Sequence, residues 1–172
     1  MKKMIALVNR YNAKENYLEV AEDIVAVELE VDNLGIGFAS KQTNRKPEWG
    51  GIAETEANFP LEKSGLEEKI NALTGNDATA EETGVMVVTN SSGYYGASVI
   101  FYDGVLEALK DYYLVPSSVH EWLAVPKSIA DKEYLAQTIR LINRTEVSPK
   151  EVLSDFPYVP VFKNGKWTIE KA

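Results

Sequence analysis

The chain has 172 residues, of which 45% are hydrophobic and 26% are charged, and this composition is typical of a folded globular protein rather than a disordered one. It contains no cysteine and a single histidine, which excludes disulfides, thiol catalysis and metal sites built from cysteine or from several histidines. The formal net charge of −8 disfavours direct binding to DNA, because phosphate backbones repel an acidic surface.

No part of the sequence has the pattern of a targeting or membrane segment. The first apolar run ends at Val8, which makes it shorter than the ~7–15 apolar residues of a signal-peptide core. No window approaches the ~20 apolar residues that a membrane-spanning helix needs. We therefore expect a cytoplasmic protein with no membrane partner.

Strand patterns dominate the first part of the chain. Met4–Val8 is a short apolar run, and Val25–Val31 alternates apolar residues with alanine and glutamate. This alternation predicts an antiparallel strand with one buried face and with Glu28 and Glu30 on the exposed face.

Three further features complete this N-terminal region. The turn residues Asp32–Asn33 lead into a predicted return strand over residues 34–39. Residues 40–64 lack periodicity and predict a long loop. Ser64–Glu67 has the spacing of a capping box, which predicts that a short helix begins there.

The second part of the chain mixes strand and helix patterns. An Asn-Gly pair at residues 164–165, between two apolar runs, predicts a C-terminal β-hairpin. Ser148–Glu151 has the spacing of another capping box, with proline in the first helical position, and predicts a second helix start. The other patterns predict strands over Gly84–Thr89 and Val119–Val125, with a turn at Pro116, and helices over Asp103–Tyr112 and Lys132–Asn143.

Together these elements predict an α+β fold, in which a mixed or antiparallel sheet carries two or three helices and a C-terminal β-hairpin. We expect a β-rich N-terminal region with one short helix over residues 1–76 and an α+β core over residues 77–172. The two regions are expected to form one compact unit, with the N-terminal sheet as an appendage.

From Gly84 to Asp155 the sequence carries a series of short motifs in a definite order. The series resembles an uncharacterised bacterial family known only as a domain of unknown function, and the resemblance covers the C-terminal half of the chain. It implies a shared fold and no particular reaction. The motifs are Val-Val-Thr-Asn (87–90), Tyr-Gly-Ala-Ser (95–98), Leu-Val-Pro-Ser-Ser-Val-His-Glu (114–121), Asn-Arg-Thr-Glu-Val (143–147) and Glu-Val-Leu-Ser-Asp (151–155).

The only histidine lies between Pro116 and Pro126, where several reactive side chains gather. Histidine titrates near neutrality, so His120 beside Glu121 is the first candidate for acid–base chemistry, with Ser118 as the candidate nucleophile. On a strand, Ser118 and His120 would share one face and Glu121 would lie on the other. The alternative is a partly buried His120 that is hydrogen bonded to a neighbouring loop. The sequence favours this alternative, because no acid–base partner of His120 can be identified from the sequence pattern.

No cofactor or metal is indicated. The aspartates and glutamates of the second part lack the spacing of an EF-hand and contain no Asp-x-Asp pair. The glycines that follow Thr89 match neither the dinucleotide-binding motif nor the P-loop motif.

The acidic segment of the N-terminal region is the candidate binding surface. Carboxylates at Glu28, Glu30 and Asp32 could dock on a basic groove of a nucleic-acid-handling protein. Tyr94 and Tyr95, expected at a loop tip, are candidate interface anchors.

Three interpretations therefore remain open, of which the third is a structural or regulatory domain with no ligand. The favoured one is a small acidic cytoplasmic binding protein, such as an inhibitor of a bacterial defence nuclease of the anti-CRISPR or anti-restriction type. Its partner would be a protein with a basic nucleic-acid-binding groove, for example a Cas-type nuclease or its RNA complex. The alternative is a small RNase-like hydrolase that acts on RNA or guide RNA through His120 and Glu121.

Overall fold

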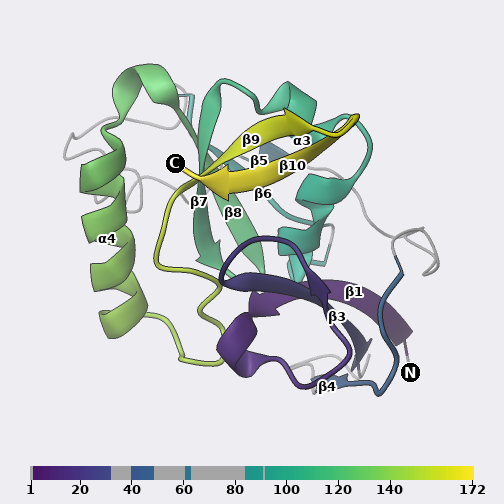
Figure 1. The fold of residues 1–172 in the computed structure, drawn as a ribbon. Helices are drawn as coiled ribbons and strands as arrows, with labels where there is room; N and C mark the ends of the chain where they lie inside the picture. Colours follow the sequence, from purple (N-terminus) through teal and green to yellow (C-terminus); the bar gives the residue numbers. More distant parts are fainter. Residues whose placement is uncertain (1, 32–39, 49–60, 63–83, 91) are drawn as a thin grey trace.

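A computed structural model describes residues 2–31, 40–48, 61–62, 84–90 and 92–172. Two antiparallel sheets form its framework (Figure 1). The first, here called the N-terminal sheet, has the order β1-β3-β2, and β4 also pairs with β3. Its strands are β1 (Lys2–Asn9), β2 (Leu18–Glu19), β3 (Ile24–Val31) and β4 (Ser40–Gln42).

Strand β3 is the centre of the N-terminal sheet, and it is buried on both faces. Strand β1 pairs along its whole length, while β2 and β4 share its other edge. Every residue of β3 except Glu30 is buried. The expectation of one exposed, acidic face was therefore wrong, because a strand with neighbours on both edges and packing on both faces has no solvent-facing side.

The second sheet, here called the C-terminal sheet, has six strands in the order β10-β9-β7-β8-β6-β5. Its two faces bury different residues in strict alternation. On β8, Trp122 and Ala124 face one core, and Leu123 and Val125 face the other. Its strands are β5 (Leu61–Glu62), β6 (Met86–Val88), β7 (Tyr112–Ser118), β8 (Glu121–Pro126), β9 (Tyr158–Lys163) and β10 (Lys166–Lys171).

Helix α4 (Lys132–Thr145) covers one face of the C-terminal sheet (Figure 1). Its N-cap is Asp131, whose carboxylate accepts the backbone N–H of Glu133 at 2.8 Å. Leu135 and Ile139 pack on Val115 and neighbouring residues of β6 and β8. The helix predicted over residues 132–143 is confirmed and runs two residues longer.

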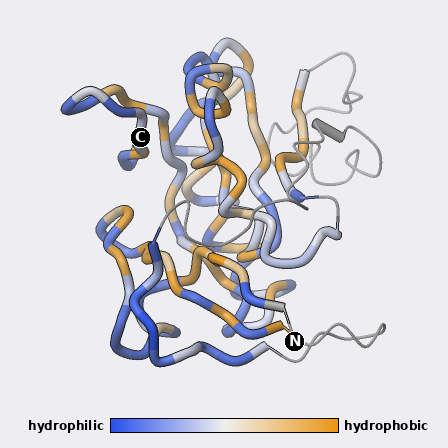
Figure 2. Tube along the Cα trace, turned by 90° about the vertical axis from the view of Figure 1, so that its right-hand side faces the viewer, coloured by the Kyte–Doolittle hydropathy of each residue, from blue (hydrophilic) through white to orange (hydrophobic). Residues whose placement is uncertain are grey.

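The opposite face of the C-terminal sheet packs against the N-terminal sheet through a shared core. This core includes Leu7 of β1 and Trp122 of β8, together with the short helices η2 (Gly96–Phe101) and α3 (Val105–Ala108). In Figure 2, hydrophobic segments (orange) run through both halves of the trace, and many of the outer loops are hydrophilic (blue). The two remaining described helices, η1 (Arg10–Asn12) and η3 (Lys127–Ile129), are single 3₁₀ turns.

The predicted α+β class is confirmed, with antiparallel sheets, helices and a C-terminal hairpin. In the hairpin turn, Asn164 and Gly165 have φ angles of 51° and 77°, as a two-residue turn with two positive φ values requires. The return strand at 34–39, the helix from Ser64 and the proposed boundary at residue 76 lie outside the described residues. No helix in the described ranges has the length and apolar character needed to span a bilayer.

Two helix predictions were wrong, the first in its extent and the second altogether. Asp103–Tyr112 contains only the four residues of α3, and the glycine before it, Gly104, has φ 81°. Ser148 does not open a helix: its C=O accepts the N–H groups of Glu151 (2.8 Å) and Val152 (3.2 Å) in a single turn. Since the Glu151 side chain contacts His120, it does not close a capping box with Ser148.

Candidate functional site

His120 lies in the turn between β7 and β8, and not on a strand as predicted. Strand β8 begins at Glu121, and Pro116 lies inside β7 opposite Trp122. The register shifts between Pro116 and Ser118, and the Ser118 hydroxyl then accepts the backbone N–H of His120 at 3.0 Å. This local hydrogen bond between a side chain and the backbone stabilises the turn, and serine commonly makes such bonds outside helices and sheets.

Both ring nitrogens of His120 are engaged. Nδ1 accepts the backbone N–H of Tyr95 at 2.9 Å, and Nε2 lies 3.1 Å from Glu151 Oε1. Because a backbone N–H can only donate, Nδ1 must present its lone pair, and the proton of the neutral ring is on Nε2. The Nε2–H group then donates to Glu151. The side chain is 21% exposed.

The loop that supplies the Tyr95 N–H is held closely against the histidine turn. The Thr89 hydroxyl donates to the C=O of His120 at 2.7 Å. Asn90 accepts the N–H of Gly93 and donates to the C=O of Tyr94, both at 2.8 Å. The Asn90 bonds hold the loop together, and the Thr89 bond ties it to the histidine turn, where the Tyr95 N–H meets the imidazole.

Tyr94 and Tyr95 are half-buried and pack on the imidazole. Their rings make edge contacts with His120 at centroid distances of 5.8 and 5.0 Å. The hydroxyl of Tyr95 lies 2.6 Å from Ser40 Oγ of the N-terminal sheet. Both tyrosines therefore lie in a loop, as expected, and each ring contacts the imidazole while staying partly exposed.

The predicted serine–histidine pair does not form. The Ser118 hydroxyl contacts the backbone of His120 and not its ring. Glu121 is directed back along β7, where its carboxylate accepts the Ser117 hydroxyl at 3.0 Å. The carboxylate that meets the imidazole is Glu151, for which the sequence pattern had predicted a role in a helix cap.

The predicted acidic surface on β3 is also absent from the described residues. Glu28 is 3% exposed, and its carboxylate accepts the hydroxyl of Thr43 at 2.9 Å. Glu30 lies between Lys3 of β1 and Lys41 of β4 in the sheet register, so cationic neighbours flank its charge. Asp32 lies outside the described residues. A partner cannot contact the Glu28 carboxylate without opening the sheet.

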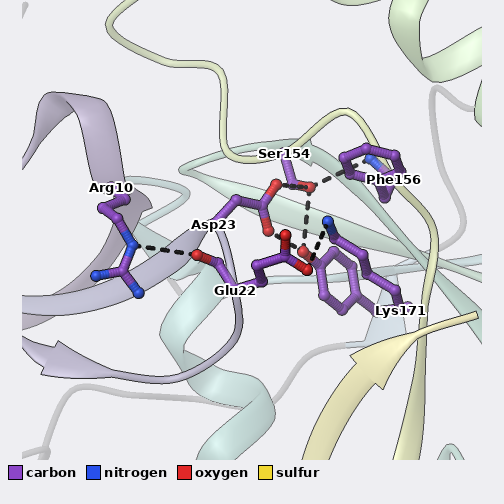
Figure 3. Close-up of polar contacts among 7 residues, drawn as sticks. Arg10, Glu22, Asp23, Ser154, Phe156 and Lys171 are labelled. Carbon is purple, nitrogen blue, oxygen red and sulfur yellow. Dashed lines mark hydrogen bonds and ion pairs between the residues drawn. The ribbon is translucent and has the colours of Figure 1, made fainter.

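A second polar cluster joins the N-terminal sheet to the segment before β9 (Figure 3). Asp23 accepts hydrogen bonds from the Ser154 hydroxyl at 2.6 Å and from the Tyr158 hydroxyl. Ser154 and Tyr158 are both 0% exposed. Burial, together with the hydrogen bond to Asp23, raises the pKa of Tyr158 well above its usual value of about 10. Since no substrate can reach these hydroxyls, the cluster is a structural one.

Further contacts surround this cluster. Asn143 of α4 donates to the Ser154 C=O and to Asp155, both at 2.9 Å. At the surface, Lys171 pairs with Glu22 at 3.2 Å, and the Lys171 ammonium lies 3.9 Å from the centroid of the Phe156 ring (Figure 3). The polar residues of the Leu-Ser-Asp segment therefore tie helix α4 and both sheets together.

Within the described part of the chain, no group of three or more histidine, aspartate or glutamate side chains is placed to hold a metal ion. A family model described as "Family of unknown function (DUF5688)" matches residues 52–159, which is more than half of the chain. The chain belongs to this family. No curated protein and no solved structure matches it.

The DUF5688 match covers more of the chain than the motifs over Gly84–Asp155 had indicated. It confirms a family of unknown function, and it begins at residue 52, well before the first motif at Gly84. The matched residues contain the histidine turn, the Tyr95 loop and Glu151, while β1 and β3 lie outside them. The hydrogen bonds of His120 therefore connect residues of the family region alone.

Proposed function

We propose that the protein is a non-catalytic acidic binding protein that docks on the basic groove of a nucleic-acid-handling partner, in the manner of an inhibitor of a defence nuclease. The observation that carries this proposal is the closed hydrogen bonding of His120, whose two ring nitrogens meet Tyr95 and Glu151. These contacts favour a binding protein over an enzyme, because they give the imidazole of His120 a structural role.

A general base must offer a free lone pair to the proton that it removes. In the neutral ring of His120, the Nδ1 lone pair accepts the Tyr95 N–H and Nε2 carries the proton. An RNase-like reaction would have to break one of these bonds before the first proton transfer. In addition, the Ser118 hydroxyl is directed to a backbone N–H and does not contact the ring.

The charge of the chain supports a basic partner. A net charge of −8 creates a field that attracts cationic surfaces and repels nucleic acid. The grooves of nucleases that hold RNA or DNA are lined by lysine and arginine, and an acidic protein competes there with the phosphate backbone. Binding of this kind weakens as the salt concentration rises.

The test is a displacement experiment with a Cas-type nuclease and fluorescently labelled guide RNA. We expect the full chain to prevent RNA binding in a salt-dependent way and to leave the RNA intact. His120→Gln, which retains one donor and one acceptor, is expected to act like the wild type. Cleavage of the labelled RNA by the chain alone, lost in His120→Gln, would contradict the proposal and support the hydrolase.

A further inference from the structure

The two ring nitrogens of His120 contact two different segments of the chain. Nδ1 accepts the backbone N–H of Tyr95 from the loop between β6 and η2, and the Nε2–H group donates to Glu151 from the turn before β9. Histidine is the side chain whose charge ordinarily changes between pH 5 and pH 8. Protonation of this ring therefore affects both contacts, and it affects them in opposite directions.

Protonation removes the contact with Tyr95. A protonated imidazole carries a hydrogen on each nitrogen, so Nδ1 no longer accepts, and two donors then face each other across 2.9 Å. The contact with Glu151 is strengthened, because the bond from Nε2–H to the carboxylate becomes charge-assisted. The ring therefore takes up a proton more readily once Tyr95 has moved away from it.

The titratable groups around the ring come from three segments. Glu151 lies 3.1 Å from Nε2. Tyr94 and Tyr95 make edge contacts with the ring, and tyrosine stays neutral at and below neutral pH. The carboxylate of Glu121, next to the histidine in sequence, accepts the hydroxyl of Ser117. The charges contributed by these groups are negative, and they favour the protonated ring.

Tyr95 is held in a backbone conformation that depends on its contacts. Its φ angle of 51° lies in the left-handed region, which tyrosine rarely adopts and which surrounding contacts must maintain. The flanking segments are held by bonds that do not involve the imidazole. Asn90 donates to the C=O of Tyr94 at 2.8 Å, and the indole N–H of Trp122 donates to the C=O of Ala97 at 2.9 Å. Protonation therefore acts on Tyr95, between two segments that stay in place.

We propose that His120 is a pH-sensitive switch, which holds Tyr95 against the histidine turn when the ring is neutral and releases it when the ring is protonated. Tyr95 is held above the pH at which the ring takes up its proton and is released below that pH. Release also affects the N-terminal sheet, because the Tyr95 hydroxyl lies 2.6 Å from Ser40 Oγ. The switch is independent of the proposed function, and it makes the Tyr95 ring more available to a partner in acid than at neutral pH.

The experiment follows the imidazole signals and the backbone amide hydrogen exchange of the full ¹⁵N-labelled chain by NMR between pH 8 and pH 5. We expect the protection factor of the Tyr95 amide, corrected for the intrinsic exchange rate, to fall about tenfold as the ring is protonated. The Val119 amide is the internal control. It lies in the same turn, is buried and donates to the C=O of Glu151 at 2.9 Å, so its protection factor should change by less than about twofold.

Two variants test whether the imidazole is responsible. In Glu151→Gln, the neutral ring keeps an acceptor for its Nε2–H group, but the protonated ring loses its ion pair. The fall in Tyr95 protection should therefore move to lower pH, by roughly 0.2–0.7 of a pH unit. In His120→Gln, which cannot be protonated in this range, the fall should be absent.

A ring that is protonated while the Tyr95 amide keeps its protection would overturn the inference, and so would a ring that stays neutral down to pH 5. Equal loss of protection at Tyr95 and Val119 would also overturn it, because the whole turn would then be unfolding. A fall that persists in His120→Gln, or that Glu151→Gln does not move to lower pH, would show that the imidazole is not the switch.

Discussion

Gly96 is the position at which a single methyl group should separate the Tyr95 loop from the histidine turn. A Cβ atom at Gly96 would lie 2.6 Å from the backbone N of Asn90 and 2.8 Å from the C=O oxygen of His120, and closer still to the hydroxyl of Thr89. Two of these three neighbours are backbone atoms. Rotation of one side chain therefore cannot relieve the clash, and the loop and the turn must move apart.

The expected cost of Gly96→Ala follows from the contacts that this movement breaks. The hydrogen bond from Thr89 to the His120 C=O, 2.7 Å long, is lost, and its loss costs about 1 kcal/mol or more because the site is largely buried. Overpacking of this kind costs a further ~1–3 kcal/mol. Alanine recovers ~0.4–1 kcal/mol by restricting the unfolded chain. The net loss of unfolding free energy is then about 1–3.5 kcal/mol.

Urea unfolding followed by tryptophan fluorescence measures this loss, with an unchanged m value as the sign that only stability has changed. Gly93→Ala is the matched control. Gly93 has φ 75°, and a Cβ atom added there would meet no atom within 4 Å. Alanine at this position therefore costs only backbone strain of ~1–2 kcal/mol. A loss below about 0.5 kcal/mol for Gly96→Ala would refute the close packing of the loop on the histidine turn.

Two further predictions concern Tyr158 and Glu151. Because the pKa of Tyr158 is raised in the folded state, the unfolded chain loses this proton first, so stability should fall by up to ~1.4 kcal/mol per pH unit above about pH 10. In Tyr158→Phe, the unfolding free energy measured with urea should fall less steeply between pH 9 and pH 11 than in the wild type. An equal pH dependence of the unfolding free energy in the two proteins would contradict the burial argument. Glu151→Ala should cost ~0.5–1 kcal/mol, while Glu151→Gln, which keeps an acceptor for the His120 Nε2–H, should cost less. Equal losses in urea unfolding would show that the hydrogen bond to the ring is not formed.

Local patterns predicted those elements whose structure depends on neighbours in sequence. The Asn164–Gly165 turn has the positive φ angles that the residue pair favours, and α4 follows from its apolar spacing. Strand β8 was predicted too, although the prediction began at Val119 and the strand begins at Glu121. In each case the residues that determine the element lie within it.

The predictions failed where a distant segment determines the outcome. The alternation in β3 looks half-buried, but β1, β2 and β4 all pair with this strand, and none of these neighbours can be read from its own residues. Likewise, Glu151 is 31 residues away from His120, and a spacing rule for helix caps gave it a local role. Of the candidate site, the sequence identified the histidine and its bond to a loop as one alternative, but neither Tyr95 as the donor nor Glu151 as the acceptor.

The account depends most directly on the state of the His120 ring, and the chain has only one histidine to observe. Long-range ¹H–¹⁵N NMR of the ¹⁵N-labelled protein at neutral pH should give one pair of imidazole signals, with the proton on Nε2 and with Nδ1 as a hydrogen-bonded acceptor. A ring that carries its proton on Nδ1, or that averages between the two tautomers, would have a nitrogen free for catalysis. Either result would contradict the structural role of His120.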